Sequence, residues 1–472
     1  MFGYRLKQCC VVLLLFCLSA CGNIRSLPDG LSFQGPQRHA GNVSFLSDIT
    51  YLDTSGKRHT EQQIMDRWLK TISKARRFIL VDMFLYNDVQ GPVPEHTRAL
   101  ADDLTRALIR QKKSYPAMRV VVITDPINVL YGGVESPHFV RLRDAGIEVY
   151  LTDLTKLRDS NPVWSAFWRV FIRPFGNSKG GHFTTKLNHP PISARSFFSF
   201  LNLKANHRKV LIVDTGKNLL AILSSGNAHD ASSAHSNVAL ALDGPAAADL
   251  LHTENAVLIF SGAQPFSIPN VRAHHKSGVY LNVLTESKVR DSLIAEIGTL
   301  EAGDELDLAM FLVSHRRVMG ALVKASERGV AIRVLLDPNE ASMGIKLSGL
   351  PNKPTAAELK EHGVDVRWCL PHGGQCHSKI LISRRASGRT WMSLGSTNLT
   401  RRSVNDFNLE TNIVLYGPSK ARVFVDANNW FQMQWANEKQ RVFSTEYEKH
   451  AGSSLAYRIS YLIFEVSGWG AF

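Results

Sequence analysis

Two short, similar stretches of sequence place the strongest constraint on this chain of 472 residues. The first is a His-x-Lys triplet, His207 and Lys209, followed by an apolar run that ends at Asp214. The second is a triplet, His377 and Lys379, followed by another apolar run. Because side chains two apart in a β-strand share a face, each stretch presents an imidazole beside an ammonium group. Together the two would form a pocket suited to a phosphodiester, which requires a nucleophile, a proton donor and positive charge.

The sequence around the two stretches is also repeated. Three pairs of apolar segments recur in the same order, at 78–85 and 305–312, at 119–126 and 333–338, and at 146–150 and 363–367. Helical patterns follow the first pair, at 96–112 and 314–328. Since strands alternate with helices, we expect an α/β fold with βαβ units and a mostly parallel sheet in each half. Recurrence in one order favours an internal duplication over unrelated core strands.

The N-terminus has the pattern of a secreted lipoprotein. Arg5 and Lys7 precede an apolar run at 11–16 that is too short to span a bilayer comfortably. The run continues to Leu-Ser-Ala before Cys21, which resembles a bacterial lipobox, where a leader is cut before a Cys that is then diacylated. We therefore expect a signal peptide at 1–20. The alternative is a short uncleaved anchor helix.

Several acyl chains on Cys21 would hold the protein firmly to a membrane. Gly22 resembles the residue that follows the Cys in lipoproteins sorted to the outer membrane. The expected location is therefore the bacterial cell envelope, at the outer membrane and facing the periplasm. The net charge of +14 favours anionic partners, either acidic lipid or nucleic acid, although a basic soluble protein would have the same charge.

Two cysteines remain once those of the leader and Cys21 are set aside. Cys369 and Cys376 could pair in an oxidising compartment. With His372 and His377 they also have the composition of a metal cluster. However, His377 already belongs to the repeated stretch, and no second Cys/His pair follows at zinc-finger spacing. We expect a disulfide or two free thiols, and no metal site.

The first half is longer than the second because it carries an insertion at roughly 154–203. Within it, the aromatic residues of 164–175 share one face of a predicted helix, and Arg169 and Arg173 flank that face. Such a helix suits a membrane interface. The alternative is an ordinary amphipathic helix packed on the core. The insertion leads directly into the first His-x-Lys strand, which favours lipid contact, and this helix or the aromatic group at 197–201 could instead cover an acyl-binding groove.

On these motifs the chain resembles the phospholipase D superfamily, whose members carry His-x-Lys-x4-Asp followed by Gly-Ser-x-Asn. The first half matches at His207, Lys209, Asp214, Ser225 and Asn227, and the second at His377, Lys379, Ser396 and Asn398. Ser224 stands in place of the first Gly. The resemblance covers roughly 44–440, and Arg402, Ser403 and Glu410 extend it towards cardiolipin-synthase-like members. It implies two tandem α-β-α sandwich halves with a pseudo-twofold active site between them.

The resemblance also implies a mechanism without metal or cofactor. His207 would attack phosphorus and form a phosphohistidine, while His377 would protonate the leaving alkoxide and then deprotonate the incoming alcohol or water. Lys209 and Lys379 would stabilise charge on the nonbridging oxygens. The residues expected to bind substrate or support this pair are Asp214, Ser225, Asn227, Asn237, Ser396, Asn398 and Glu410.

Two positions depart from the family pattern. Arg384 stands where the second motif has an Asp. The resemblance implies a structural role for that Asp, beyond the catalytic strand, so we expect the change to be tolerated. In the family an acid from one half orients the His of the other. Glu410 is placed to do so for His207, but the corresponding residue for His377 is Asn237. A neutral Asn can orient an imidazole but stabilises its protonated form less.

The expected organisation is a leader at 1–20, a lipidated Cys and tether at 21–43, a first half at 44–262, a linker at 263–278, a second half at 279–440 and a tail at 441–472. The anchor, the aromatic insertion 164–175 and the basic charge favour a monomeric enzyme that acts on phospholipids, by cardiolipin-synthase-like transfer or by phospholipase D hydrolysis. The alternatives are a periplasmic nuclease on the same scaffold, for which nucleic acid would be the partner, and a catalytically impaired lipid-binding protein.

Overall fold

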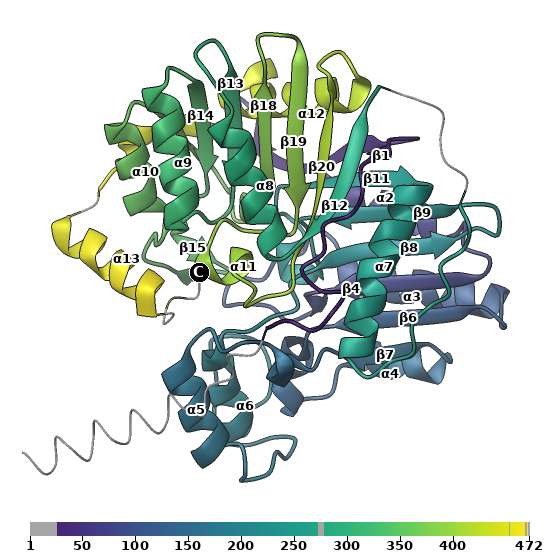
Figure 1. Cartoon of the computed structure of the whole chain (residues 1–472). Helices are drawn as coiled ribbons and strands as arrows, with labels where there is room; N and C mark the ends of the chain where they lie inside the picture. Colours follow the sequence, from purple (N-terminus) through teal and green to yellow (C-terminus); the bar gives the residue numbers. More distant parts are fainter. Residues whose placement is uncertain (1–25, 272–277, 453, 468–469, 471–472) are drawn as a thin grey trace, which may run out of the picture.

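The computed structural model describes residues 26–271, 278–452, 454–467 and 470. The predicted leader and the lipidation site at Cys21 lie outside these residues. Two large β-sheets form the centre of the described chain, and helices pack on them (Figure 1). Each large sheet contains the strands of one predicted half, apart from one strand near each end of the described chain that joins the second sheet, and the α/β fold class is confirmed.

The two sheets share a common plan. The first has eight strands in the order β3 (Arg58–Glu61), β2 (Ser44–Leu52), β11 (Asn237–Asp243), β9 (Leu219–Ser224), β8 (Lys209–Asp214), β4 (Phe78–Met83), β6 (Arg119–Thr124) and β7 (Glu148–Leu151). The second has nine strands in the order β1 (Arg38–His39), β12 (Tyr280–Thr285), β20 (Thr411–Pro418), β19 (Arg389–Gly395), β18 (Lys379–Arg384), β13 (Glu305–Met310), β14 (Ala331–Leu336), β17 (Asp365–Cys369) and β21 (Ser444–Glu446). The run from β11 to β7 has the same order as the run from β20 to β17, as an internal duplication predicts.

The prediction of mostly parallel sheets is wrong. Among the described strands of the large sheets, only β4, β6 and β7 run parallel in the first and only β13, β14 and β17 in the second. The His-x-Lys strands β8 and β18 pair antiparallel with β4 and β13, and each opens a meander through β9 and β11 or through β19 and β20. The length of the connections explains why the strands within each meander are antiparallel. The turns after β8 and β18 are short, whereas a parallel neighbour requires a long crossover.

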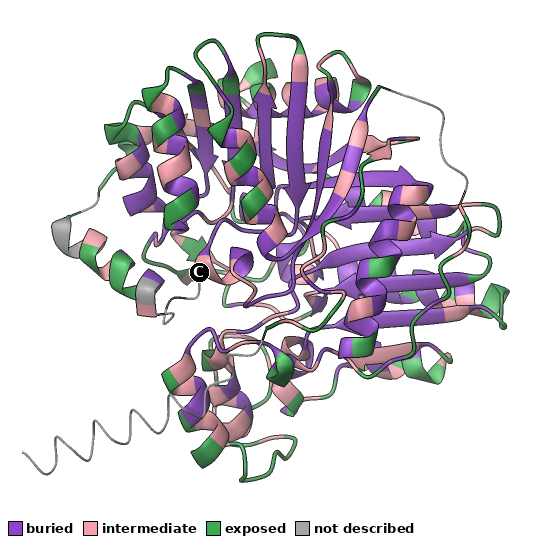
Figure 2. Cartoon of the chain, viewed as in Figure 1, coloured by how far each residue is buried: buried purple, intermediate pink, exposed green. Residues whose placement is uncertain are grey.

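Burial on both faces explains why the strands read as continuous apolar runs. Along β4, Ile79 and Val81 belong to an outer core beneath α2 (Ile64–Ile72), α3 (Leu100–Ser114) and α4 (Pro137–Asp144). Phe78 and Leu80 belong instead to a core shared by the two halves, with α7 (Pro245–Phe260) and α12 (Arg422–Ala436). The outer helices of the second half are α8 (Ser287–Gly298), α9 (Arg316–Glu327) and α10 (Asn352–Glu361). Figure 2 shows this burial along the strands of both sheets.

The two ends of the described chain differ from the predicted boundaries. The predicted tether packs on the body, where β1 pairs antiparallel with β12 at the edge of the second sheet and Leu31 and Ala40 are buried. The predicted tail begins as part of the second half, because β21 pairs with β17. A last helix, α13 (Leu455–Ser467), follows. Neither edge pairing is visible in a local pattern, because both join segments far apart in sequence.

The insertion lies outside the two sheets and contains α5 (Pro162–Phe171) and α6 (Ala194–Ser199) (Figure 1). Helix α5 begins where Pro162 occupies the first turn and the Asn161 side chain accepts a hydrogen bond from the backbone N–H of Trp164. No helix of the described chain is both long and apolar enough to cross a membrane.

Candidate active site

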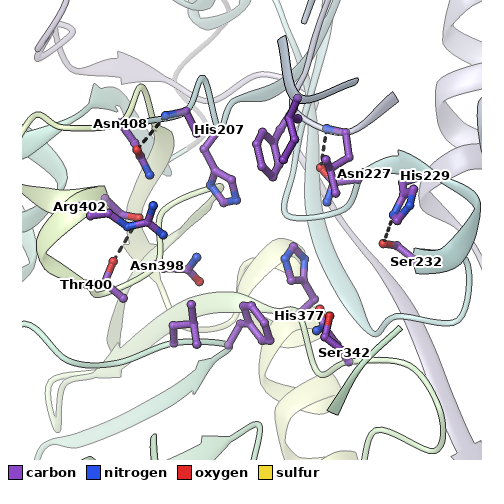
Figure 3. A pocket seen from close by; sticks show the side chains of 18 of the residues that line it. His207, Asn227, His229, Ser232, Ser342, His377, Asn398, Thr400, Arg402 and Asn408 are labelled. Carbon is purple, nitrogen blue, oxygen red and sulfur yellow. Dashed lines mark hydrogen bonds between the residues drawn. The ribbon is translucent and has the colours of Figure 1, made fainter. Parts of the chain in front are cut away.

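His207 and His377 line one cavity of about 340 Å³ that residues of both halves enclose. Figure 3 shows the two imidazoles entering it from the segments that precede β8 and β18, with Asn398 and Arg402 beside them. Asn227 lines the same cavity. Both histidines are nearly buried, with 8% and 6% of their surface exposed. The structure therefore brings the two predicted His-x-Lys stretches together at a single site.

The backbone of each histidine is held by the opposite half. The N–H of His207 donates to the carbonyl of Leu409 at 2.8 Å, and the N–H of His377 donates to the carbonyl of Ser236 at 2.9 Å. These contacts belong to two isolated parallel bridges, one on each side of the cavity. The residue following each carbonyl in the sequence is the one that reaches the imidazole.

The loops after β6 and β14 fix the residue before each histidine. Asp125 accepts a hydrogen bond from the N–H of Asn206 at 2.8 Å, and Asp337 accepts one from the N–H of Cys376 at 2.8 Å. Burial raises the pKa of Asp125 to about 7 and that of Asp337 to about 6, while these backbone donors oppose the rise. The repeated Asp-Pro segments therefore serve to position the catalytic strands.

The Nδ1 atom of each imidazole faces a polar side chain from the other half. Glu410 Oε2 lies 2.9 Å from His207 Nδ1, and Asn237 Oδ1 lies 3.1 Å from His377 Nδ1. A carboxylate and an amide oxygen both accept, so each imidazole donates through Nδ1 and directs Nε2 to the cavity. The structure thus pairs the same residues that the sequence spacing matched.

The two motif serines support these partners rather than line the cavity. Ser396 Oγ donates to Glu410 Oε2 at 2.5 Å, and Ser225 Oγ donates to Asn237 Oδ1 at 3.1 Å. Each serine oxygen also accepts from the backbone N–H that follows its partner, Thr411 or Val238. Each half therefore builds the same chain of contacts from serine to partner to histidine.

In each motif a phenylalanine ring contacts both the histidine and the lysine, a feature that the sequence interpretation missed. The Phe84 ring lies 4.7 Å from the His207 ring and 4.8 Å from Lys209 Nζ. The equivalent Phe311 distances, to His377 and Lys379, are 4.9 Å and 5.0 Å. Both phenylalanines line the cavity. Their recurrence after β4 and β13 was the available signal, but it was read only as part of two core strands.

The two lysines are buried and donate to the carbonyl of their own histidine, at 2.5 Å for Lys209 and 2.8 Å for Lys379. Burial lowers the pKa of Lys209 to about 7 and holds that of Lys379 well below its ordinary range. Burial also lowers the pKa of His207 to about 4, although Glu410 opposes the change, and it lowers the pKa of His377 strongly. The site disfavours positive charge while no anion is bound, so a phosphate would restore charge to these groups.

Two further residues that the sequence singled out lie away from the histidines. Asp214 ends β8 and accepts a hydrogen bond from the N–H of Gly216 at 2.6 Å, so it caps a turn and does not line the cavity. Arg384 forms ion pairs with Glu305 and Asp307 on the neighbouring strand, at 2.7 Å and 2.6 Å. The basic residue in place of the family Asp is therefore accommodated within the sheet, away from the cavity.

Cys369 and Cys376 form a disulfide, with their Cα atoms 6.2 Å apart. The bond joins the end of β17 to the residue before His377 and leaves no thiol for the metal cluster considered above. Within the residues that the structure describes, no group of three or more His, Cys, Asp or Glu is arranged to hold a metal ion.

Comparison with known proteins bears on the second half and on the overall fold. The family model described as cardiolipin synthase, PLD-like domain, matches residues 293–435, which lie in the second half. No curated protein matches the sequence.

Solved structures give the following likenesses. Phosphatidylserine synthase from Haemophilus influenzae Rd KW20 matches with a TM-score of 0.53 and 8% identity, over 91% of this chain and 94% of that chain, which shows a shared fold. Polyphosphate kinase from Porphyromonas gingivalis has a TM-score of 0.43 and 14% identity, over 89% of this chain and 52% of that chain. Nuc, a phospholipase D family member from Salmonella typhimurium, has a TM-score of 0.26 and 18% identity, over 34% of this chain and 97% of that chain. The family model places a PLD-like domain at residues 293–435, and with the shared fold and the paired His-x-Lys motifs in one cavity it makes the chain similar to the phospholipase D superfamily.

Proposed function

We propose that the chain is a membrane-associated phosphodiesterase or phosphatidyltransferase that acts on phospholipids through a phosphohistidine. One observation carries the proposal. Two imidazoles, each oriented through Nδ1, share a cavity with a lysine behind each of them. This arrangement supplies a nucleophile, a proton donor and two cations for a phosphodiester.

In the first step, His207 Nε2 attacks phosphorus and forms a P–N bond. The P–O bond to the leaving alcohol breaks, and the departing oxygen takes a proton from His377 Nε2. In the second step, His377 takes a proton from water or an alcohol, whose oxygen attacks phosphorus while the P–N bond breaks. The nucleophilic role of His207 is supported by Glu410, because a carboxylate at Nδ1 stabilises the positive charge that the ring gains on attack.

The lysines and cavity amides would bind the phosphoryl oxygens. Lys209 and Lys379 are near enough to both imidazoles to influence their charge. Asn227 follows β9 and Asn398 follows β19, at equivalent positions of the two halves, and both line the cavity. Loss of one such donor to developing negative charge costs about 10²–10³ in rate.

The exposed face of α5 supports contact with a membrane, in addition to the anchor proposed at Cys21. Phe167 and Phe171 are 40% and 45% exposed, and Phe175, just beyond the helix, is 80% exposed. A contiguous apolar face in water is typical of an interaction surface. The tryptophans expected on this face lie differently, because the indole N–H groups of Trp164 and Trp168 donate to backbone carbonyls of Phe198 and Arg195 in and beside α6.

The test uses mature protein and vesicles of phosphatidylglycerol and phosphatidylethanolamine, with lipid products identified by mass spectrometry. We expect new phospholipid from wild type and none from H207A. Cardiolipin would identify a transferase, and phosphatidic acid would identify a hydrolase. If wild type forms no new lipid with glycerol or ethanol added as acceptor, but cleaves single-stranded DNA, the proposal fails and the nuclease alternative replaces it.

A further inference from the structure

A second cavity, of about 240 Å³, lies beneath the insertion and next to the catalytic one. The two cavities share Tyr131 and Lys204 among their lining residues. The second is strongly basic, since its lining includes Arg169, Arg173, Arg195 and Lys204. Most of its lining residues belong to the insertion at roughly 154–203, which the second half lacks.

Two of these cations are neutralised by one buried acid. Asp159, which is 3% exposed, pairs with Arg169 at 2.6 Å and with Lys204 at 2.6 Å. The guanidinium groups of Arg173 and Arg195 have no ion pair or hydrogen bond within the described residues. Asp153 is the acid among the residues that line the cavity itself, and it lies 3.8 Å from Lys156. The cavity therefore has positive charge available for an anion.

An apolar groove adjoins this basic cavity on its outer side. Phe171, Ile172, Phe175 and Phe198 line the groove, and Arg195 lines both the groove and the cavity. The exposed phenylalanines are those proposed above to face the membrane. The groove therefore leads to the two arginines, and the arginines lead to the basic cavity and the catalytic site. A glycerophospholipid has its parts in the same order: acyl chains, phosphate and headgroup.

We propose that this insertion cavity binds an anionic glycerophospholipid, separate from the molecule bound between His207 and His377. Arg173 and Arg195 hold its phosphate, the aromatic groove contacts its acyl chains, and its headgroup points towards Tyr131 and Lys204. The inference rests on the proposed function and deepens it, because it places a second lipid beside the site of phosphoryl transfer. Arginine suits the role, since its planar fork binds phosphate oxygens in pairs.

The test counts bound lipid by native mass spectrometry of the full mature chain in detergent micelles with phosphatidylglycerol. We expect two lipids on wild type and one on R173A/R195A, with affinity for the second falling about tenfold or more, as for lost charge-assisted hydrogen bonds. R110A/K113A is the matched control, because it removes the same charge from the exposed side of α3. R173K/R195K should retain part of the affinity.

Equal lipid counts for wild type and R173A/R195A would overturn the inference, and so would an equal loss in R110A/K113A. Inorganic phosphate at millimolar concentration separates the two possible sources of the anion. A second lipid that persists in phosphate supports a lipid site, whereas complete displacement would reassign the cavity to free anions. Thermal unfolding confirms that each variant is folded.

Activity of the same variants separates this inference from the proposed function. If wild type forms new lipid and R173A/R195A does so equally well in vesicles, only the second site is wrong. If wild type forms no new lipid, the proposed function fails whatever the lipid count. We expect R173A/R195A to lose activity on vesicles about tenfold while retaining activity on a soluble nitrophenyl phosphodiester, which does not occupy the groove.

Discussion

Asn237 Oδ1 lies 3.1 Å from His377 Nδ1, at the position where the other half places Glu410 Oε2 2.9 Å from His207 Nδ1. The two imidazoles therefore have matching surroundings except for one charge. A carboxylate stabilises the protonated ring and an amide does not, so His377 is the weaker base of the pair. This difference can be tested because it affects the pH dependence of each step.

Substitution N237D should move the alkaline limb of the kcat/KM profile to higher pH. Burial holds the pKa of His377 far below its ordinary value, and a general acid works only while it is protonated. A carboxylate at position 237 raises that pKa, so activity is lost at a higher pH, by about one unit or more. The measurement is a pH–rate profile of both proteins on a soluble diester.

A shift of the acidic limb instead would indicate that His377 acts as the neutral nucleophile. An unchanged profile would show that the partner at Nδ1 does not control the titration. N237S removes the amide without adding charge, so it is the matched control for the loss of the Asn237 side chain.

The covalent intermediate should form on His207 when His377 is replaced. In H377A, a diester with a nitrophenol leaving group needs no general acid, so attack by His207 Nε2 can proceed while the second step lacks its base. We expect a phosphorylated peptide containing His207 after acid-free digestion and mass spectrometry. A modified His377 in H207A, with none at His207 in H377A, would reverse the assigned roles.

Replacement of Phe84 should affect catalysis more than stability. Its ring contacts both His207 and Lys209, and the contact with an ammonium group is worth about 0.5–2 kcal/mol. F84L should therefore lower kcat/KM by about tenfold, and F84Y, which keeps an aromatic face, should recover most of it. Equal losses in both variants, accompanied by a fall in Tm, would show that the residue only fills space.

Reduction of the disulfide should destabilise the second half. Cys369 and Cys376 are separated by 7 residues, and a loop of this size stabilises the folded state by about 2 kcal/mol. We expect dithiothreitol to lower the Tm of wild type by a few degrees and to lower activity, because Cys376 precedes His377. C369S/C376S should have the lower Tm without reductant and should not respond to it. Equal Tm values for wild type with and without reductant would contradict the prediction.

The repeated features of the sequence were the most predictable. A duplicated strand order and a duplicated His-x-Lys pair are local patterns, and they identified the α/β fold and the residues that meet in the cavity. Glu410 and Asn237 could be matched to their histidines because each lies the same distance before a Gly-Pro pair, Gly417-Pro418 in the second half and Gly244-Pro245 in the first. The roles of these residues stay predictions until the variants above are measured.

The features that escaped prediction depend on tertiary pairing. Strand direction is not encoded in apolar composition, so the antiparallel meanders after β8 and β18 were missed. The pairing of β1 with β12 joins an N-terminal segment to the second half, far away in sequence. The orientation of Trp164 and Trp168 is set by contacts with α6, whereas helical spacing alone grouped them with the exposed phenylalanines.

Each half contributes to the histidine of the other, both through backbone pairing and through Glu410 or Asn237. We therefore expect neither half to form the complete site when expressed alone, and we expect the two halves to complement one another when expressed as separate fragments. A change at position 237 in the first half therefore alters the surroundings of His377, which lies 140 residues later in the second half. The halves differ in the insertion at 154–203, which the first half alone carries. It has an exposed aromatic face and reaches the shared cavity through Phe200 and Leu203.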